Sequence, residues 1–263
     1  MSDGGFVVDS ARLTRAWSPL AAALVSFHRG NNSATVTVKN DFGQREELPA
    51  SLFFRREEDF EEWEGLALER CGTRVLDVGA GVGAHALPLQ ERGHRVTALE
   101  LLPDAVRIMR ERGVTDVRQG TLADVTDWAT YDTLLLLMHG SMIAESLLGL
   151  DRLLDRAALL VTPGGVLLMD STDLREDSSV EFQLEDDGRY FGELHYQLSA
   201  GGVESEIFPQ LFVDAETLAE HGQRAGWDTE IVWRGPGGRY LAKLTSVADH
   251  RARHDGSVSK ALS

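Results

Sequence analysis

A glycine-rich segment at residues 75–84 is the part of the sequence best suited to hold a ligand. It reads Val75-Leu76-Asp77-Val78-Gly79-Ala80-Gly81-Val82-Gly83-Ala84 and joins an apolar run to an amphipathic one. Glycines at this spacing permit a tight turn and let a ligand approach the backbone amides at the start of a helix. The segment also satisfies the loose G-x-G-x-x-G/A pattern of nicotinamide dinucleotide sites. The glycines alone therefore do not decide between cofactor classes.

Two carboxylates narrow the choice of cofactor. Asp77 lies two residues before the first glycine, and Glu100 ends the next apolar run. An acid at position 77 would repel the pyrophosphate of a dinucleotide, whereas it would attract a cationic amine or sulfonium. Glu100 can accept hydrogen bonds from both hydroxyls of a ribose, which suits either class. The charge of Asp77 favours a cofactor with cationic groups, and an NAD(P)-dependent oxidoreductase stays open as an alternative.

Four motifs resemble those of the class I S-adenosylmethionine-dependent methyltransferases. They are Leu76-Asp77-Val78-Gly79-Ala80-Gly81-Val82-Gly83, Ala98-Leu99-Glu100, Tyr131-Asp132-Thr133-Leu134-Leu135-Leu136-Leu137-Met138 and Thr162-Pro163-Gly164-Gly165-Val166-Leu167-Leu168-Met169. Two further stretches, Leu52-Phe53-Phe54-Arg55 and Ala84-His85-Ala86-Leu87, look like a little-characterised bacterial branch of that family. The resemblance implies S-adenosyl-L-methionine as cofactor. It also implies an α/β fold with a Rossmann-like, doubly wound sheet of seven strands whose last strand is antiparallel.

The resemblance further implies which residues contact the cofactor. The glycine loop would lie against its methionine and ribose portions, Glu100 would hold the ribose hydroxyls, and Asp77 would face the amino group. After the third strand the family usually has Gly-Asp-Ala, where this chain has Gly120-Thr121-Leu122-Ala123-Asp124, so backbone at Leu122 or the side chain of Asp124 would substitute near the adenine. Arg55 is a candidate partner for the cofactor's carboxylate, with an ordinary surface arginine as the alternative. The predicted cofactor-binding residues are Asp77, Gly79, Ala80, Gly81, Gly83, Glu100, Leu101, Thr121, Leu122 and Met138.

Methyl transfer from a sulfonium is an in-line displacement in which the cofactor supplies the leaving group. The protein must place an acceptor lone pair near the methyl group, exclude water and, for some acceptors, remove a proton. His139 follows the fourth predicted strand, so we predict it as the general base, with His195 and Tyr196 as second choices. The sequence shows no spacing typical of metal ligands, and we predict no metal.

The apolar runs predict elements that bring these residues to one edge of a sheet. Strands are predicted at 74–78, 95–99, 114–118, 131–138 and 165–170, and helices at 83–92, 103–112 and 141–159. Alternation of this kind gives a parallel sheet covered by helices. Two final strands, 228–234 and 239–245, are joined by Gly235-Pro236-Gly237-Gly238, a tight link that makes them antiparallel.

Three regions follow from this arrangement. Residues 71–246 are predicted to form the S-adenosylmethionine-binding methyltransferase domain, with a β-hairpin insertion at about 189–213. Residues 1–70, with a helix capped by Ser10, a second helix from about Pro19, a hairpin at roughly 34–48 and a helix at 57–71, are predicted to form an N-terminal lid. Residues 247–263 are polar and are predicted to be a flexible tail.

Charge and composition restrict the partners. The 263 residues include 26 basic and 42 acidic side chains, so the formal net charge is −16. This balance disfavours nucleic acid and anionic membranes. Cys71 is the only cysteine, which excludes an internal disulfide. We therefore predict a cytoplasmic enzyme that methylates an oxygen or nitrogen atom of a small molecule, with a homodimer left open. A peptide or protein side chain as acceptor, or a non-catalytic regulator that only binds the cofactor, are the alternatives.

Overall fold

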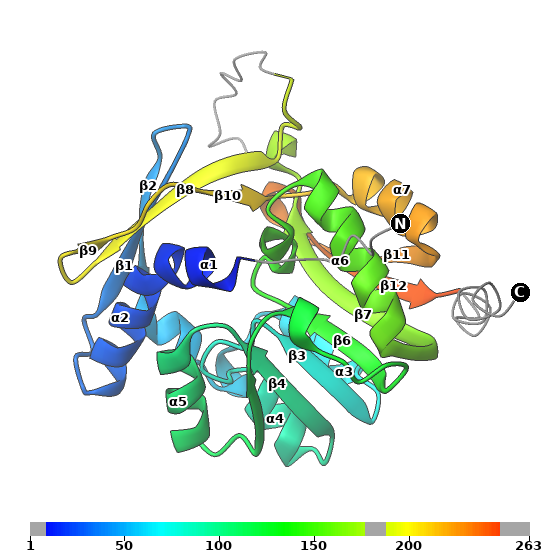
Figure 1. Ribbon diagram of the computed structural model, residues 1–263, viewed down its shortest axis with the longest axis horizontal. Helices are drawn as coiled ribbons and strands as arrows, with labels where there is room; N and C mark the ends of the chain where they lie inside the picture. Colours follow the sequence, from blue (N-terminus) through cyan, green and yellow to red (C-terminus); the bar gives the residue numbers. More distant parts are fainter. Residues whose placement is uncertain (1–8, 177–187, 248–263) are drawn as a thin grey trace, which may run out of the picture.

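A seven-stranded sheet forms the centre of the protein in a computed structural model that describes residues 9–176 and 188–247 (Figure 1). Its strand order is β11-β12-β7-β6-β3-β4-β5. The strands are β3 (Arg74–Val78), β4 (Arg95–Glu100), β5 (Asp116–Gln119), β6 (Tyr131–Leu136), β7 (Val161–Thr172), β11 (Trp227–Arg234) and β12 (Arg239–Ser246). The first five are parallel, and β12 is antiparallel to both β7 and β11. The predicted Rossmann-like sheet with an antiparallel last strand is confirmed.

Helices cover both faces of this sheet, because neighbouring residues of its buried strands point to opposite sides. In β6, Leu134 packs in the core beneath the helices α6 and α7, whereas Leu135 packs in the core beneath α3 and α4. The sheet is therefore doubly wound. The helices that cover it are α3 (Glu62–Glu69), α4 (Ala86–Glu91), α5 (Pro103–Glu111), α6 (Leu147–Leu160) and α7 (Ala215–Ala225).

A second, antiparallel sheet of five strands lies beside the central one (Figure 1). Its strands are β1 (Thr35–Asn40), β2 (Arg45–Pro49), β8 (Glu193–Ala200), β9 (Val203–Glu204) and β10 (Phe208–Leu211). Both predicted hairpins are present in it. The sequence did not reveal that β1 and β8 pair, with Thr37 opposite Ser199, so that the two hairpins form one sheet.

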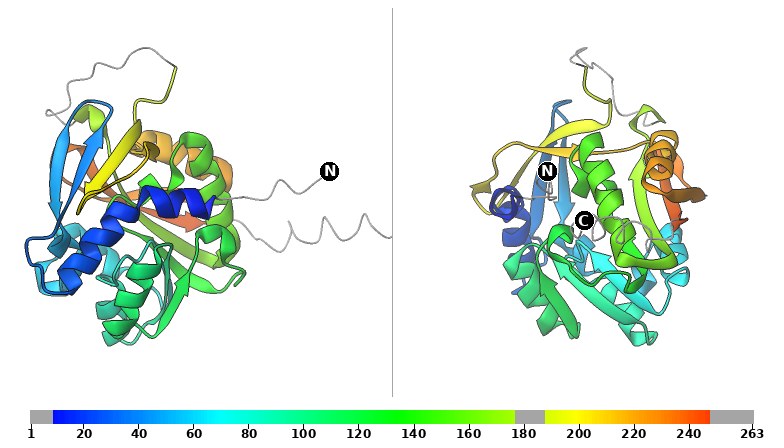
Figure 2. Two further views of the ribbon diagram at one scale, coloured as in Figure 1. Left: turned by 60° about the vertical axis from the view of Figure 1, so that its left-hand side comes forward. Right: turned by 45° about the vertical axis from the view of Figure 1, so that its right-hand side comes forward.

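Two N-terminal helices, α1 (Ser10–Ala16) and α2 (Ser18–His28), connect this second sheet to the rest of the protein. Ala23 of α2 packs in the core of the second sheet, and Leu24 packs against Ile108 of α5. Figure 2 shows α1 and α2, in dark blue, between the second sheet and the central domain. We call α1, α2 and the second sheet together the roof.

Several element boundaries differ from the prediction. Asp9, not Ser10, caps α1, because its carboxylate accepts a hydrogen bond from the backbone N–H of Arg12 at 2.9 Å. The helix predicted at 83–92 begins only at Ala86, which leaves Pro88 in the first turn, where it removes no intrahelical hydrogen bond. The helix predicted at 57–71 is α3 alone, preceded by a short 3-10 turn at Glu57–Asp59. The other 3-10 turns are Ala50–Phe54, Leu122–Asp124, Gly140–Ala144, Leu174–Glu176 and Pro236–Gly238.

The helix predicted at 141–159 also begins later, at Leu147. The preceding segment is the 3-10 turn Gly140–Ala144, and Glu145 adopts φ 63°, which ends that turn. Ser146 then caps α6 by accepting a hydrogen bond from the N–H of Gly149. The predicted tail at 247–263 lies, except for Val247, outside the described residues. Within the described ranges, no helix has both the length and the apolar character that crossing a bilayer requires.

Candidate functional site

A pocket lies at the carboxyl ends of β3, β4 and β6, between the central sheet and the roof. All but one of the predicted cofactor-binding residues line it, together with the predicted base. These residues are Asp77, Gly79, Ala80, Gly81, Glu100, Leu101, Thr121, Leu122, Met138 and His139. The remaining one, Gly83, does not line the pocket. A Cβ on Gly83 would lie 2.9 Å from Cγ2 of Val114, so this glycine permits close packing behind the loop.

The glycine loop turns back on the neighbouring strand. The backbone N–H groups of Gly79 and Ala80 both donate to the carbonyl of Leu99, at 2.9 and 3.0 Å. Gly81 adopts φ 57°, a region that side chains disfavour, and a Cβ placed on it would meet no atom within 4 Å. The loop therefore presents open space to the pocket at Gly81.

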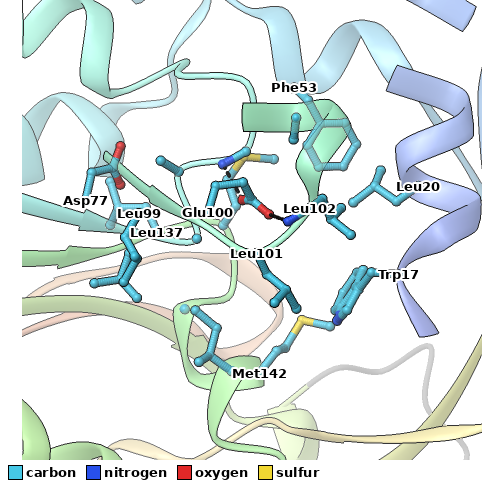
Figure 3. A pocket seen from close by; sticks show the side chains of 18 of the residues that line it. Trp17, Leu20, Phe53, Asp77, Leu99, Glu100, Leu101, Leu102, Leu137 and Met142 are labelled. Atoms are coloured by element: carbon cyan, nitrogen blue, oxygen red, sulfur yellow. Dashed lines mark hydrogen bonds between the residues drawn. The ribbon is translucent and has the colours of Figure 1, made fainter. Parts of the chain in front are cut away.

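Glu100 is buried at the end of β4 and is fixed by two backbone groups. Its Oε2 accepts from the N–H of Gly81 and its Oε1 from the N–H of Leu102, both at 2.8 Å (Figure 3). Burial, with a smaller contribution from the charge of Asp77, raises the pKa of Glu100. Because each carboxylate oxygen has a second lone pair, Glu100 can still accept two hydrogen bonds from a ligand.

Asp77 has an unsatisfied oxygen in the same pocket. The side chain is buried, and its Oδ2 has no hydrogen-bond partner among the described residues. Burial raises the pKa of Asp77 to about 6, and the nearby His85 opposes that shift. Buried polar atoms nearly always have a partner, so this oxygen fits a cationic or N–H-bearing ligand group.

Arg55 does not reach the pocket, which corrects its proposed pairing with a cofactor carboxylate. Its Nη1 and Nη2 donate to the two oxygens of Glu64 at 2.8 Å each, and Glu64 is fully buried. The same carboxylate lies 2.8 Å from Nε2 of His85, which lines the pocket. Arg55 and Glu64 therefore fix the orientation of a pocket residue from behind. Glu64 and His85 are 21 residues apart in the sequence, so their contact could not be predicted from a local motif.

The segment after β6 has a strained backbone at the pocket wall. Met138, His139 and Glu145 have φ angles of 64°, 60° and 63°, which are uncommon for residues with a side chain. Asp170 of β7 stabilises this conformation, since its carboxylate accepts from the N–H groups of His139 at 2.9 Å and of Gly140 at 3.2 Å. This role of Asp170 could not be predicted from the sequence, because Asp170 lies on β7, 31 residues after His139.

His139 points its ring toward the end of the second sheet. Its Nδ1 lies 3.5 Å from Oγ1 of Thr172, and its ring meets that of Phe212 edge-on, with centroids 5.3 Å apart. Burial lowers the pKa of His139. A lowered pKa keeps the imidazole neutral at physiological pH, so the ring can accept a proton.

The second choices for a base lie elsewhere. His195 is largely exposed, and its Nδ1 contacts Oδ2 of Asp41 at 3.0 Å. Neither His195 nor Tyr196 lines the pocket. Asp124 does not line it either, because its Oδ2 accepts hydrogen bonds from the N–H and the hydroxyl of Thr121, at 2.8 and 2.9 Å.

The roof supplies the wall opposite the glycine loop. Figure 3 shows Trp17 and Leu20 of the roof, together with Phe53 of the turn Ala50–Phe54, on the far side of the pocket from Asp77. No sequence pattern indicates two further wall residues, Leu13 and Gln210, because their positions depend on how the roof packs. Among the described residues, the acids Asp77, Glu100 and Glu145 line the pocket, and no lysine or arginine does. No group of three or more His, Cys, Asp or Glu side chains within these ranges is placed to hold a metal ion.

Comparison with known proteins relates this arrangement to methyl-transfer enzymes. A family model described as "Methyltransferase domain" matches residues 42–230. The crystal structure of an S-adenosylmethionine-dependent methyltransferase from Bacteroides fragilis, in complex with S-adenosyl-L-homocysteine, is 32% identical to this chain with a TM-score of 0.78. The alignment covers 89% of this chain and 96% of that one.

Two curated proteins match over shorter regions. A malonyl-[acyl-carrier protein] O-methyltransferase from Serratia marcescens is 29% identical over 104 residues, which is 40% of each protein. A 2-heptyl-1-hydroxyquinolin-4(1H)-one methyltransferase from Mycobacteroides abscessus is 40% identical over 62 residues, 22% of this chain and 27% of that protein. The chain thus aligns with less than half the length of either curated relative.

Proposed function

This chain belongs to the family of S-adenosylmethionine-dependent methyltransferases, and we propose that it transfers the cofactor's methyl group to an oxygen or nitrogen atom of a small molecule. One observation carries the proposal. A single pocket holds the unsatisfied carboxylate of Asp77, the glycine loop, Glu100 and the neutral imidazole of His139. Groups able to bind a ligand and to accept a proton are therefore present in one space.

The residues present fit S-adenosylmethionine. Asp77 would accept from the cofactor's ammonium group, which gives its orphaned Oδ2 a partner. Glu100, already oriented by Gly81 and Leu102, would accept from the ribose hydroxyls. When bound, the cofactor supplies the electrophilic methyl group and the leaving group. The open space at Gly81 leaves room for it beside the loop. The other residues that would contact it are Gly79, Ala80, Leu101, Thr121, Leu122 and Met138.

The acceptor would occupy the part of the pocket beside His139 and beneath the roof. Its wall there is mainly apolar, which excludes water from the reacting atoms. His139 would take the proton of a hydroxyl or amine acceptor, and Asp170 would hold the backbone of His139 in place. In this proposal residues 71–246 are the cofactor-binding domain, and residues 1–70 with 189–213 act as its lid. The heteroaromatic substrate named for the Mycobacteroides abscessus relative also favours a small molecule.

Cofactor titration followed by product analysis tests this function. Isothermal titration should show binding of S-adenosylmethionine and S-adenosylhomocysteine and none of NAD. Asp77→Asn should weaken this binding. Mass spectrometry should then detect a gain of one methyl group in small molecules from extracts incubated with protein and cofactor. Binding of NAD alone would contradict the cofactor assignment, and methylated peptides as the main product would contradict a small-molecule acceptor.

A further inference from the structure

Gln210 of β10 has a hydrogen-bonding atom that the fold leaves unused. The side chain is 1% exposed and lines the pocket. Its Nε2 donates to the carbonyl of Pro209 at 2.6 Å, whereas its Oε1 has no hydrogen-bond partner among the described residues. Rotating the amide by 180° would place Oε1 against that carbonyl oxygen, so the contact with Pro209 fixes the orientation. Oε1 of Gln210 is therefore a buried acceptor without a partner in the described part of the chain, in a residue of the pocket wall.

This oxygen belongs to the part of the pocket beside His139. Phe212 follows β10 and packs with the pocket residue Met142, whereas Leu211 and Val213 pack in the core of the central domain. The ring of Phe212 contacts the ring of His139. The intervening residue, Leu211, accepts a hydrogen bond from Ser141 of the loop that follows His139, at 2.9 Å. The residues next to Gln210 therefore contact His139 and the loop that follows it.

The charges around the pocket select against an anionic acceptor. No lysine or arginine among the described residues lines it. The third acid of the wall, Glu145, is neutralised by Arg12, which donates to both of its oxygens. A carboxylate or phosphate on the acceptor would thus lose its hydration without gaining a counter-charge, which is costly. The neighbouring wall residues Leu13, Trp17 and Met142 favour an apolar body.

We propose that Gln210 is a specificity-determining residue for an uncharged, largely apolar acceptor that bears an O–H or N–H group. The O–H or N–H group of the acceptor donates a hydrogen bond to Oε1 of Gln210. This bond gives the buried amide oxygen the partner that it lacks among the described residues. The inference rests on the proposed methyl transfer and adds the chemical class of the acceptor. A site with a buried unpaired acceptor discriminates strongly against analogues that lack the donor, because the amide oxygen would then stay unsatisfied.

The test uses compounds of matched size and different charge. The full chain is incubated with S-adenosylmethionine carrying a labelled methyl group and with panels of naphthalene- and quinoline-sized compounds. Each panel bears hydroxyl, N–H, carboxylate or phosphate substituents. Labelled products should come from the hydroxyl and N–H panels. In Gln210→Met the KM for these acceptors should rise about 3- to 10-fold, with a smaller change in kcat.

Gln197→Met is the matched control. Gln197 lies in β8 of the same sheet and does not line the pocket. Its substitution by Met should therefore leave the KM for the acceptor unchanged. Titration with S-adenosylhomocysteine should give the same Kd for wild type and both variants. An unchanged KM in Gln210→Met, or products mainly from the carboxylate or phosphate panels, would overturn the inference and leave methyl transfer in place. The inference would also be overturned if the hydroxyl and N–H panels gave no methylated product while the wild-type protein still bound S-adenosylhomocysteine. Absence of cofactor binding by wild type would instead remove the proposed function.

Discussion

Nη2 of Arg12 donates to both carboxylate oxygens of Glu145, at 2.5 and 2.7 Å. Arg12 belongs to α1 of the roof, and Glu145 ends the strained segment that follows His139. The pair therefore joins the roof to the part of the central domain that lines the pocket beside His139. Both side chains are partly exposed, and such pairs contribute only about 0–1 kcal/mol, so the contact can open reversibly.

Removing this ion pair should speed cofactor release. In Arg12→Met, α1 loses its connection to Glu145, and we expect S-adenosylhomocysteine to dissociate about 2- to 5-fold faster, with a change in unfolding free energy below about 1 kcal/mol. Stopped-flow displacement measures the rate. Arg15→Met is the control on the same helix. Arg15 is exposed, and its contact with an acid is long, with Nε 3.9 Å from Oε1 of Glu206. Equal dissociation rates in the two variants would show that the ion pair does not retain the cofactor.

Glu100→Ala should weaken cofactor binding strongly. The substitution removes a charged acceptor for two ribose hydroxyls, so binding of the cofactor should become less favourable by roughly 1.5–3 kcal/mol. Titration calorimetry with S-adenosylhomocysteine measures the loss. Glu69→Ala, at the exposed end of α3, should bind like wild type. Wild-type affinity in Glu100→Ala would place the ribose elsewhere in the pocket.

Asp77 should make cofactor affinity depend on pH. Its pKa in the free protein is raised to about 6 by burial, so below pH 6 the carboxyl group is protonated. A cationic amine requires the ionised form, and the Kd should therefore rise as the pH falls below 6, approaching tenfold per unit. In Asp77→Asn this contribution should disappear, although Glu100, whose pKa is also raised, still titrates. A pH profile identical to wild type in Asp77→Asn would exclude Asp77 as the amine's partner.

The same substitution should stabilise the free protein at neutral pH. A carboxyl group with a raised pKa favours the folded state in its protonated form, and this contribution is lost as the pH rises from about 4 to about 6. Asp77→Asn avoids that loss, so its free energy of unfolding at pH 8 should exceed that of wild type by about 1–3 kcal/mol. Urea denaturation at pH 4 and pH 8 checks this, since the difference should nearly vanish at pH 4. A destabilised variant at pH 8 would mean that Asp77 has a structural role.

His139→Ala should reduce turnover by about 10²–10⁴ with a hydroxyl or protonated amine acceptor, because the base is lost. Its lowered pKa means that the neutral form persists to a lower pH than for an ordinary histidine, so wild-type activity should decline only on the acidic side of about 6.5. Rates against pH, with cofactor affinity measured in parallel, check both points. His195→Ala, outside the pocket, should match wild type. Full turnover in His139→Ala would exclude it as the base.

The central sheet could be predicted because short segments of the sequence determine its strands and the turns between them. The run from Val75 to Ala84 contains a strand, a turn and the start of a helix, and parallel strands place their carboxyl ends together. The antiparallel pairing of the last two strands followed from the short link at Gly235. The pairing of β1 with β8 could not be predicted in this way, since each hairpin is locally complete and carries no signal for its neighbour.

The same distinction applies to the pocket. Glu100 and the loop at Gly81 could be found because one strand and one turn position them. Gln210 and Leu13 could not, because the roof alone brings them to the pocket. The predicted contact between Arg55 and the cofactor's carboxylate is wrong, because the guanidinium of Arg55 instead donates to the fully buried carboxylate of Glu64 on α3.

The β1–β8 pairing also sets an order of events during synthesis. Thr37 pairs with Ser199, 162 residues later in the chain. At about 5–20 residues per second, the ribosome needs roughly 10–30 s to make that stretch, and β1 has no partner on its β8 side during this time. An unpaired strand edge invites aggregation. The acidic residues Glu46 and Glu47 lie on β2, at the opposite edge of this hairpin, and their like charges oppose contact between newly made chains there.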